Sequence, residues 1–366
     1  MAGMSLEDLD VLLVRLGSTA GLRAAEEELE LALRRAGARV YAVRAERPRP
    51  VRTMALTDLT WAYAARRAAH ELLTARRPPR AVIYSTVTAA LLWRRPGAIV
   101  FDSPAAANRP GRHGVWQRPL ERRRLREAPL LLPSSVGALA EASAALGGTL
   151  DTARAFVLPV PIAPAESDEH SAPPPLDPET NGHPATARPE RDVDALTYAA
   201  NPSKKGLDRV LDAWRRARRP GERLVVAGID RERLRELGYA VPDEDVHVVG
   251  MLRPEEYRTV LRRARVFVCA PRREEYGLAQ LEALAEGCQL VTAPAPGGYV
   301  ALPLARTLDP RLVGEDLADG LRAALDTPRA DYASRAAELM APYTTDAVDR
   351  LVAEELLPRL LEAREI

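Results

Sequence analysis

Two adjacent lysines are the residues in this chain whose type most directly suggests chemistry. Lys204 and Lys205 are the only lysines among 52 basic residues. Such a strong preference for arginine is typical of a GC-rich bacterial genome, and a position that keeps lysine under that bias indicates a need for a compact ammonium group. The pair lies in Asn201-Pro-Ser-Lys-Lys-Gly206, between a predicted strand and a predicted helix, where open α/β folds bind ligands. The segment therefore predicts a diphosphate site, with Gly206 allowing close backbone approach. The alternative is a solvated turn.

Two glutamates eight residues apart form the second candidate group. Glu274 lies in a loop, and Glu282 lies on the predicted helix that follows from Gly277 and Leu278. Leu278, Glu282 and Ala285 share one helix face, which the pattern predicts to be buried. A buried carboxylate needs partners, and the vicinal hydroxyls of a ribose would provide them. The start of the helix offers free amides to a phosphate. The alternative is an ordinary amphipathic helix with solvated glutamates.

Weaker candidates lie in the first half of the chain and after a later strand. Gly17 and Gly21 are predicted to lie in the loop after the first strand, and Gly297-Gly298 follows the last strand of the second half. Asp102 follows a predicted strand, and His113 lies in the loop beyond it. A loop histidine is a candidate catalytic group near an acceptor hydroxyl, although such residues are more often structural.

The segment from Arg109 to Glu127 is rich in arginine with interspersed apolar residues. Such a segment is able to rest on anionic lipid, which would fit a lipid-linked acceptor. The alternative is a solvated basic face.

Strand and helix patterns alternate through both halves of the chain, which predicts an α/β protein with doubly wound parallel sheets. Residues 1–162 are predicted to form a Rossmann-like acceptor-binding domain and residues 193–344 a Rossmann-like donor-binding domain. Residues 163–192 contain seven prolines and one large aliphatic residue, which is typical of a flexible linker. Residues 345–366 are predicted to form a helix that packs back on the first domain, with Pro358 kinking it.

The predicted strands of the first half are Val11 to Val14, Val40 to Val43, Ala81 to Tyr84, Ile99 to Phe101, Leu130 to Leu132 and Phe156 to Leu158. Those of the second half are Ala195 to Ala199, Leu224 to Ala227, Val246 to Val249, Val266 to Cys269 and Leu290 to Ala293. The two domains are expected to face each other across a cleft.

Composition narrows the classes of function. The formal net charge is +1, which argues against a nucleic-acid-binding protein. Two cysteines, Cys269 and Cys288, cannot build a disulfide scaffold, so a reducing compartment is expected. No signal peptide and no membrane-spanning segment is evident. We therefore expect a cytoplasmic protein, with peripheral contact at the inner face of the membrane through 109–127.

These motifs together resemble family 4 retaining glycosyltransferases of the GT-B fold, in the group 1 glycosyl transferases. The matching segments are Lys204-Lys205-Gly206-Leu-Asp, Val246-His-Val-Val-Gly250, Ala264-Arg-Val-Phe-Val, Glu274-Glu-Tyr-Gly-Leu-Ala-Gln-Leu-Glu282 and Gly297-Gly298. The spacing between Glu274 and Glu282 is the most specific of them. Weaker matches in the first half are Gly21, Leu131-Leu-Pro-Ser-Ser135 and Val157-Leu-Pro-Val.

The resemblance implies a hexosyltransferase-type enzyme that moves a sugar from a nucleotide-sugar donor to a sugar or lipid-linked acceptor, in cell-envelope, polysaccharide or glycolipid synthesis. It implies that Glu282 contacts the donor ribose, that Glu274 lies beside the donor sugar and that Lys205 holds the diphosphate. Amides near Tyr276, Gly277 and Leu278 would assist, and Gly250 and Met251 would lie near the base. No metal or other cofactor is expected, because fixed positive groups stabilise the leaving diphosphate.

The chain also departs from the family pattern. Ala199 and Ala200 stand where the family usually has an arginine that clamps phosphate, and Glu275 replaces a usual glycine. Two other functions therefore remain open. One is a nucleotide-sugar epimerase or hydrolase on the same fold, and the other is a non-catalytic nucleotide-sugar-binding protein.

Overall fold

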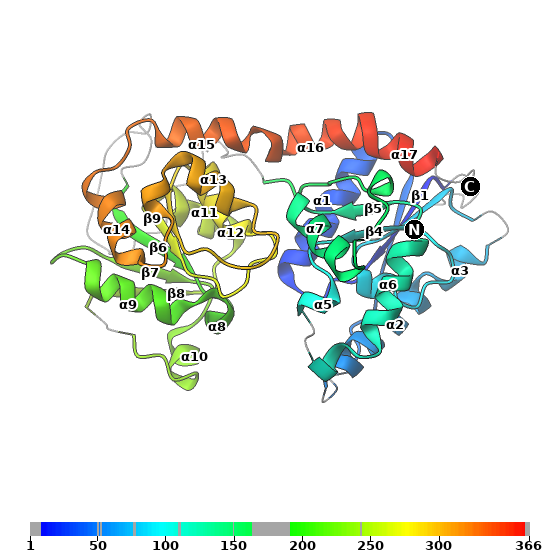
Figure 1. The fold of residues 1–366 in the computed structure, drawn as a ribbon, viewed down its shortest axis with the longest axis horizontal. Coiled ribbons are helices and arrows are strands. Elements are labelled where there is room, and N and C mark those ends of the chain that lie inside the picture. The colour runs from blue at the N-terminus through cyan, green and yellow to red at the C-terminus, as the bar shows by residue number, and fades with distance from the viewer. Residues whose placement is uncertain are drawn as a thin grey trace. The chain divides into compact units, whose positions relative to one another are not determined.

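The computed structural model describes residues 9–49, 51, 53–75, 78–108, 111–148, 150–162, 191–241 and 244–362. The chain divides into two compact units. The first unit combines Met1–Pro161 with Pro342–Ile366, and the second is Ile162–Ala341 (Figure 1).

A five-stranded parallel sheet forms the centre of the first unit. Its strands are β1 (Val11–Arg15), β2 (Val40–Arg44), β3 (Ala81–Tyr84), β4 (Ala98–Phe101) and β5 (Leu131–Pro133). They lie in the order β2-β1-β3-β4-β5. Successive side chains of a strand point to opposite faces. Accordingly, Leu12 and Val14 enter one apolar cluster, while Val11 and Leu13 enter another. Both faces of the sheet are therefore buried, as is typical of parallel sheets.

Helices cover both faces of this sheet. They are α1 (Ala20–Arg35), α2 (Met54–Ala68), α3 (His70–Leu73), α4 (Val87–Ala90), α5 (Ala105–Asn108), the 3₁₀ helix η2 (Gly111–Gly114), α6 (Gln117–Glu127), α7 (Val136–Ala145) and the 3₁₀ helix η3 (Thr152–Arg154). The prediction that Gly21 lies in the first loop is wrong, because Gly21 lies in the first turn of α1. The helix begins early because the Thr19 hydroxyl caps it, accepting a hydrogen bond from the Leu22 amide.

The predicted strand Phe156 to Leu158 is not a strand. The segment runs beside β5, and the amides of Phe156 and Leu158 donate to the carbonyls of Leu131 and Pro133. Only one isolated bridge, between Leu131 and Ala155, is formed. Pro159 and Pro161 follow directly and offer no amide that would extend the pairing.

The second unit contains another five-stranded parallel sheet. Its strands are β6 (Val193–Tyr198), β7 (Leu224–Ala227), β8 (Val246–Gly250), β9 (Ala264–Cys269) and β10 (Gln289–Thr292), in the order β10-β9-β6-β7-β8. Each lies within two residues of its predicted bounds. The chain builds outward from β6 through β7 and β8, then returns to place β9 on the other side of β6. This reversal makes the carboxyl ends of β6 and β9 the topological switch point, where such folds bind ligands.

The helices of the second unit are α8 (Pro202–Lys205), α9 (Leu207–Ala217), α10 (Arg231–Glu236), α11 (Pro254–Arg263), α12 (Leu278–Ala285), α13 (Ala301–Leu308), the 3₁₀ helix η4 (Pro310–Leu312), α14 (Leu317–Asp326) and α15 (Tyr332–Met340). The predicted turn at the lysines is the one-turn helix α8. Asn201 caps it, and Gly206, with φ +66°, ends it before α9 begins.

The C-terminal segment returns to the first unit. After the 3₁₀ helix η5 (Ala341–Tyr343), it forms α16 (Thr345–Leu351), the π-helix η6 (Val352–Leu356) and α17 (Leu357–Glu362). Val348, Val352, Leu356 and Leu360 pack in the same cluster as Val11 and Leu13. Pro358 provides no amide for a regular helical bond to residue 354, and the wider π-turn lies immediately before it.

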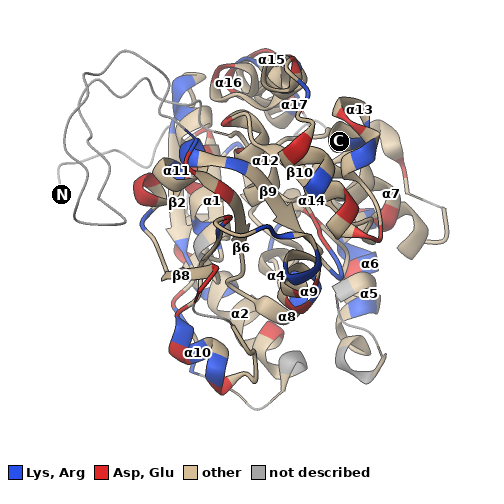
Figure 2. Ribbon diagram, turned by 90° about the vertical axis from the view of Figure 1, so that its left-hand side faces the viewer, with Lys and Arg blue, Asp and Glu red and all other residues tan. Residues whose placement is uncertain are grey.

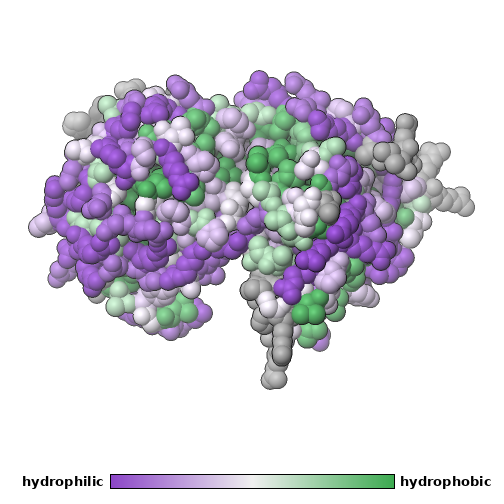
Figure 3. Space-filling model, in the orientation of Figure 1, coloured by the Kyte–Doolittle hydropathy of each residue, from purple (hydrophilic) through white to green (hydrophobic). Residues whose placement is uncertain are grey.

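Nearly all of the predicted linker, residues 163–190, lies outside the described residues. No helix among the described residues is both long enough and apolar enough to cross a bilayer. The visible faces of both units are largely hydrophilic, with hydrophobic areas of limited extent (Figure 3).

Candidate functional site

The switch point of the second unit brings the lysine pair to the two glutamates after β9. Lys205 Nζ lies 2.5 Å from Glu274 Oε2, and Lys204 Nζ lies 2.5 Å from Glu275 Oε2. Both carboxylates are buried, whereas the lysine side chains remain 42% and 21% exposed for Lys204 and Lys205. The site therefore has two ammonium groups at its solvent side and two carboxylates beneath them.

The loops that carry these residues are packed directly against each other. A Cβ at Gly206 would lie 1.9 Å from the carbonyl oxygen of Ala270, so a glycine is required there. The Arg272 amide donates to the Lys204 carbonyl at 2.9 Å. Arg272 also donates to both carboxylate oxygens of Asp208, at the start of α9. The backbone of the lysine pair is thus fixed before any ligand arrives.

Glu274 is held by its neighbours on three sides. The Gln280 amide donates to Glu274 Oε2 at 3.1 Å, and the Glu274 backbone amide donates to the Pro296 carbonyl. Gly297, with φ +118°, packs so closely that a Cβ there would lie 2.0 Å from the Glu274 carbonyl oxygen. The paired glycines after β10 therefore position Glu274 through its backbone.

Helix α12 begins beside this group without a side-chain cap. Its N-cap is Gly277, with φ +93°, and its first residue is Leu278. The Tyr299 ring packs against Gly277, and Tyr276 is buried. The first amides of the helix are therefore free of a capping side chain and carry the partial positive charge of a helix N-terminus.

Glu282 lies one turn further along α12 and is partly exposed. The fully buried positions of this helix are Gln280, Leu281, Ala283 and Leu284, so the predicted burial of the face with Leu278, Glu282 and Ala285 is wrong in degree. Those four buried positions are the ones that α12 packs against β9 and β10. Partial burial still raises the pKa of Glu282 to about 7, with Arg258 opposing the rise and Glu286 adding to it. Its charge also contributes to the raised pKa of Tyr198, after burial.

Tyr198 and Tyr257 are site residues that the sequence analysis missed. Their rings lie 5.3 Å apart, and the Glu282 charge also helps to raise the pKa of Tyr257, after burial. A Cβ at Gly228 would lie 2.7 Å from the Tyr198 ring. The sequence could have pointed to Tyr198 only through its position, because Tyr198 ends β6 and Gly228 directly follows β7 at the same sheet edge.

Gly250 and Met251 lie at the carboxyl end of β8. Gly250, with φ +76°, lies against the Asp230 carboxylate and accepts from the Gly228 amide at 2.7 Å. Met251 is 65% exposed. An exposed apolar side chain at the end of a strand offers a surface against which a flat ring can pack.

Two candidates of the first unit, Gly17 and Asp102, lie at the carboxyl edge of its own sheet. Gly17 follows β1 with φ +63°, and the exposed Asp102 follows β4. The backbone of His113 lies in η2, and its side chain is outside the described residues.

The side chain of Glu26, from helix α1, reaches the loop after β1 at the switch point of the first sheet. Its Oε1 accepts hydrogen bonds from the Leu16 amide (2.7 Å), the Gly17 amide (3.1 Å) and the Ser85 hydroxyl (2.6 Å). Arg15 lies 3.7 Å from Oε2. Because a buried carboxylate already satisfies these amides, this loop is not available to a phosphate.

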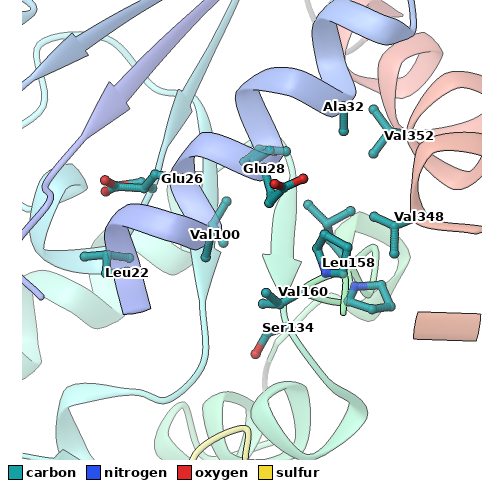
Figure 4. A pocket seen from close by; sticks show the side chains of 15 residues that line it. Leu22, Glu26, Glu28, Ala32, Val100, Ser134, Leu158, Val160, Val348 and Val352 are labelled. Carbon is teal, nitrogen blue, oxygen red and sulfur yellow. The ribbon is translucent and has the colours of Figure 1, made fainter. Parts of the chain in front are cut away.

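A pocket of about 60 Å³ lies beside this loop, between α1, residues 158–161 and α16. Leu158 and Val348 form part of the apolar wall of the pocket, and the Glu26 side chain points away from them (Figure 4). Its lining contains carboxylates and hydroxyls but no lysine or arginine. The pocket therefore suits an uncharged group and not a phosphate.

The basic segment 109–127 is mostly helix α6. Gln117, Glu121 and Leu125 are buried on one face, and Glu121 accepts from the Ala105 amide. Trp116 and Leu120 pack against the core. Leu120 and Leu125 of the helix therefore face inward, whereas Arg122, Arg123 and Arg126, and Val115 before the helix, are exposed.

Basic and acidic residues lie side by side on the surface of the second unit, for example on α10 (Figure 2). Within the described part of the chain, no group of three or more His, Cys, Asp or Glu side chains is arranged to hold a metal ion.

Comparison with known proteins identifies the second unit. The family model described as "Glycosyl transferases group 1" matches residues 179–335, which include β6 to α14 and every residue of the lysine–glutamate group. This part of the chain is therefore similar to the glycosyl transferases group 1 family. The match to the group 1 domain supports glycosyl transfer as its activity. A search of curated protein sequences found no match.

Several solved structures are similar to this chain across nearly its whole length. WaaG, a glycosyltransferase involved in lipopolysaccharide biosynthesis, is 15% identical, with a TM-score of 0.62 and coverage of 97% of this chain and 98% of that one. Sucrose-phosphate synthase from Thermosynechococcus elongatus is 17% identical, with a TM-score of 0.68 and coverage of 97% and 100%. HepE from Anabaena, solved with UDP and glucose, is 13% identical, with a TM-score of 0.58 and coverage of 94% and 98%. At these identities the likeness shows the fold, and it confirms the predicted α/β GT-B architecture around the group 1 domain.

Proposed function

We propose that this protein is a retaining, metal-independent glycosyltransferase that moves a sugar from a nucleotide-sugar donor to an acceptor not yet identified. The observation that carries the proposal is the position of the two lysines. They converge at the switch point of the group 1 domain, beside the uncapped start of α12. Cations and helix amides at one point are suited to a diphosphate.

Transfer breaks the bond between the anomeric carbon of the sugar and the diphosphate oxygen, and a new bond forms to an acceptor hydroxyl. Negative charge then develops on the diphosphate, and positive groups fixed beforehand stabilise that charge most effectively. In the proposed site Lys205 and the amides near Leu278 receive it. Glu274, held by Gln280 and Lys205, would lie beside the sugar. We assign no protein nucleophile.

The residues that would contact the ribose and the base of the donor are assigned by their position and by the family pattern. Glu282 would accept hydrogen bonds from the ribose hydroxyls. The base would lie near Gly250 and Met251. HepE was solved with UDP and glucose, so UDP is the first nucleotide to test.

The first unit would bind the acceptor, with Gly17, Asp102 and His113 at or near the carboxyl edge of its sheet. WaaG acts in lipopolysaccharide synthesis, and a role in envelope, polysaccharide or glycolipid synthesis at the inner face of the membrane is proposed here on that analogy. The inward-facing apolar residues of α6 favour an electrostatic contact with anionic lipid through its exposed arginines over insertion.

A thermal-shift titration with UDP, GDP and ADP tests the proposal, using wild type, Lys205→Ala and the control Arg219→Ala. Arg219 lies before β7, at the opposite sheet edge, and pairs with Asp326. A nucleotide at 100 times its Kd adds about 2.7 kcal/mol, or roughly 5–10 °C for a unit of this size. We expect a shift with one base, reduced by Lys205→Ala and kept in the control. The absence of any shift would contradict the proposal.

Ala199 and Ala200, in place of the usual arginine, favour a second candidate, a nucleotide-sugar-binding protein without transferase activity. Nucleotide binding without transfer or donor hydrolysis across a broad acceptor panel would support it. Transfer that persists in excess EDTA would support the metal-independent enzyme.

A further inference from the structure

The lysine–glutamate group neutralises itself in the ligand-free site. Lys204 and Lys205 each pair at 2.5 Å with a different one of two consecutive glutamates. The two ammonium groups that would hold a diphosphate are therefore already bound to internal anions. Any anion that enters must compete with those carboxylates.

Each carboxylate has a second partner, a hydrogen-bond donor for Glu274 and an ion-pair partner for Glu275, that would remain if its lysine moved. Gln280 donates to Glu274 Oε2 at 3.1 Å, and Arg273 Nε lies 3.5 Å from Glu275 Oε1. A buried carboxylate left without any partner would be strongly destabilising. These second partners remove that obstacle, so a lysine can exchange its carboxylate for a phosphate at a low cost.

The exposed fractions of the Lys204 and Glu275 side chains indicate from which side an anion would approach. The Lys204 side chain is 42% exposed, whereas the Glu275 side chain beneath it is 11% exposed. An anion would therefore reach the ammonium group from solvent while the glutamate stays in place. The Arg272 amide holds the Lys204 carbonyl. The exchange therefore moves only the Lys204 side chain and leaves its backbone in place.

We propose that Glu275 is a built-in competitor of the diphosphate, and that Lys204 changes partner from Glu275 to phosphate when a nucleotide binds. This inference rests on the proposed function. The exchange makes Lys204 a second diphosphate-binding residue beside Lys205. It also weakens the hold on the nucleoside diphosphate product, because Glu275 recaptures Lys204 as the product leaves.

Calorimetric titration with inorganic pyrophosphate, UDP, GDP and ADP tests the exchange in four proteins, with Lys205→Gln and Arg219→Gln as two further controls. The four proteins are wild type, Glu275→Gln, Lys204→Gln and the double variant. Hydrogen bonds to charged groups change affinity by about tenfold or more. Glu275→Gln should therefore tighten binding of the preferred nucleotide about tenfold, and Lys204→Gln should weaken it about tenfold. If Glu275 acts through Lys204, Glu275→Gln should tighten binding only about twofold in the Lys204→Gln background.

Unchanged or weaker binding in Glu275→Gln would overturn the inference, as would an equal gain in both backgrounds. Should Glu275→Gln fail to fold, Lys204→Gln alters a partly exposed side chain and tests the exchange from the other side; unchanged affinity there also overturns it. Arg219→Gln controls for loss of a surface charge. If wild type binds and Lys205→Gln weakens binding while the Lys204 and Glu275 variants match wild type, only this inference fails. If no nucleotide binds wild type, the proposed function fails with it.

Discussion

Glu282 has a protonation equilibrium set by its surroundings. It lies on a helix whose neighbouring positions are fully buried, yet it keeps contact with solvent. Burial raises its pKa to about 7, and Arg258 only partly opposes the rise. A carboxyl group that lies mostly buried yet reaches solvent is well placed to accept hydrogen bonds from the hydroxyls of a ligand.

The first prediction concerns the stability of Glu282→Gln. The pKa of Glu282 is higher in the folded protein than in the unfolded chain. The folded protein therefore loses stability as the pH rises from about 4.5 through 7 and the Glu282 carboxyl group ionises. At pH 8 the variant should be more stable than wild type by up to about 3 kcal/mol, and at pH 5 the two should be nearly equal. Urea unfolding at both pH values measures this difference. The variant should bind the preferred nucleotide more weakly, and equal stability differences at the two pH values would contradict the argument.

The second prediction compares two glycines that both have positive φ. At Gly206 an added Cβ would meet the Ala270 carbonyl oxygen at 1.9 Å, whereas at Gly238, with φ +80°, it would meet nothing within 4 Å. Gly238→Ala should cost about 1 kcal/mol from backbone strain alone. Gly206→Ala should cost about 3 kcal/mol or more, and it should also abolish nucleotide binding by displacing the lysines. Thermal unfolding and calorimetry measure both effects, and equal costs would show that the loops are not in close contact.

At the scale of elements, the C-terminal helices complete the core of the first unit. Val348, Val352, Leu356 and Leu360 recur every four residues and are all buried. In an ideal α-helix such a stripe drifts around the axis, since four residues exceed one turn. The wider π-turn of η6 reduces that drift and also accommodates Pro358. One local irregularity thus keeps four side chains on the same core.

The third prediction follows from this packing. Leu356→Ala removes a fully buried side chain and should lower the stability of the first unit by about 3 kcal/mol. Leu357→Ala, at the next and partly exposed position, should cost less than half of that. Hydrogen exchange of peptides from β1 and β3 in increasing urea measures the effect. Equal effects of the two variants would argue against the burial of Leu356.

For the whole molecule, the two sheets have different chemistry at corresponding switch points. In the second unit the loops present two lysines and free helix amides. In the first unit Glu26 already accepts from the corresponding loop amides. The phosphates are therefore expected to bind to the second unit alone.

The fourth prediction locates nucleotide binding by hydrogen exchange. A saturating concentration of the preferred nucleoside diphosphate should slow exchange at residues 201–206 and 274–280. Amides of residues 16 and 17 should keep their rate, because their hydrogen bonds to Glu26 do not change. Protection confined to the first unit would contradict this assignment, and Glu26→Gln should speed exchange at those two amides without changing nucleotide affinity.

The local elements and the chemical types available to the site can be predicted from the sequence. Strand residues such as Val11 to Val14 are apolar without interruption, which is typical of a strand buried on both faces. The lysine pair is recognisable because the rest of the chain uses arginine. These features depend on neighbours in the sequence, and local periodicity records them.

Which side chains meet depends on the order of the strands in each sheet. Lys204 and Glu275 are 71 residues apart, and they pair because the sheet order places β9 beside β6. The same holds for Tyr198 beside Tyr257 and for Glu26 beside Ser85. Sequence periodicity sets the face on which a side chain lies, but strand order sets what lies opposite that face. For that reason the lysine pair and Glu274 can be singled out from the sequence, whereas their partners, and the pairing of Tyr198 with Tyr257, cannot.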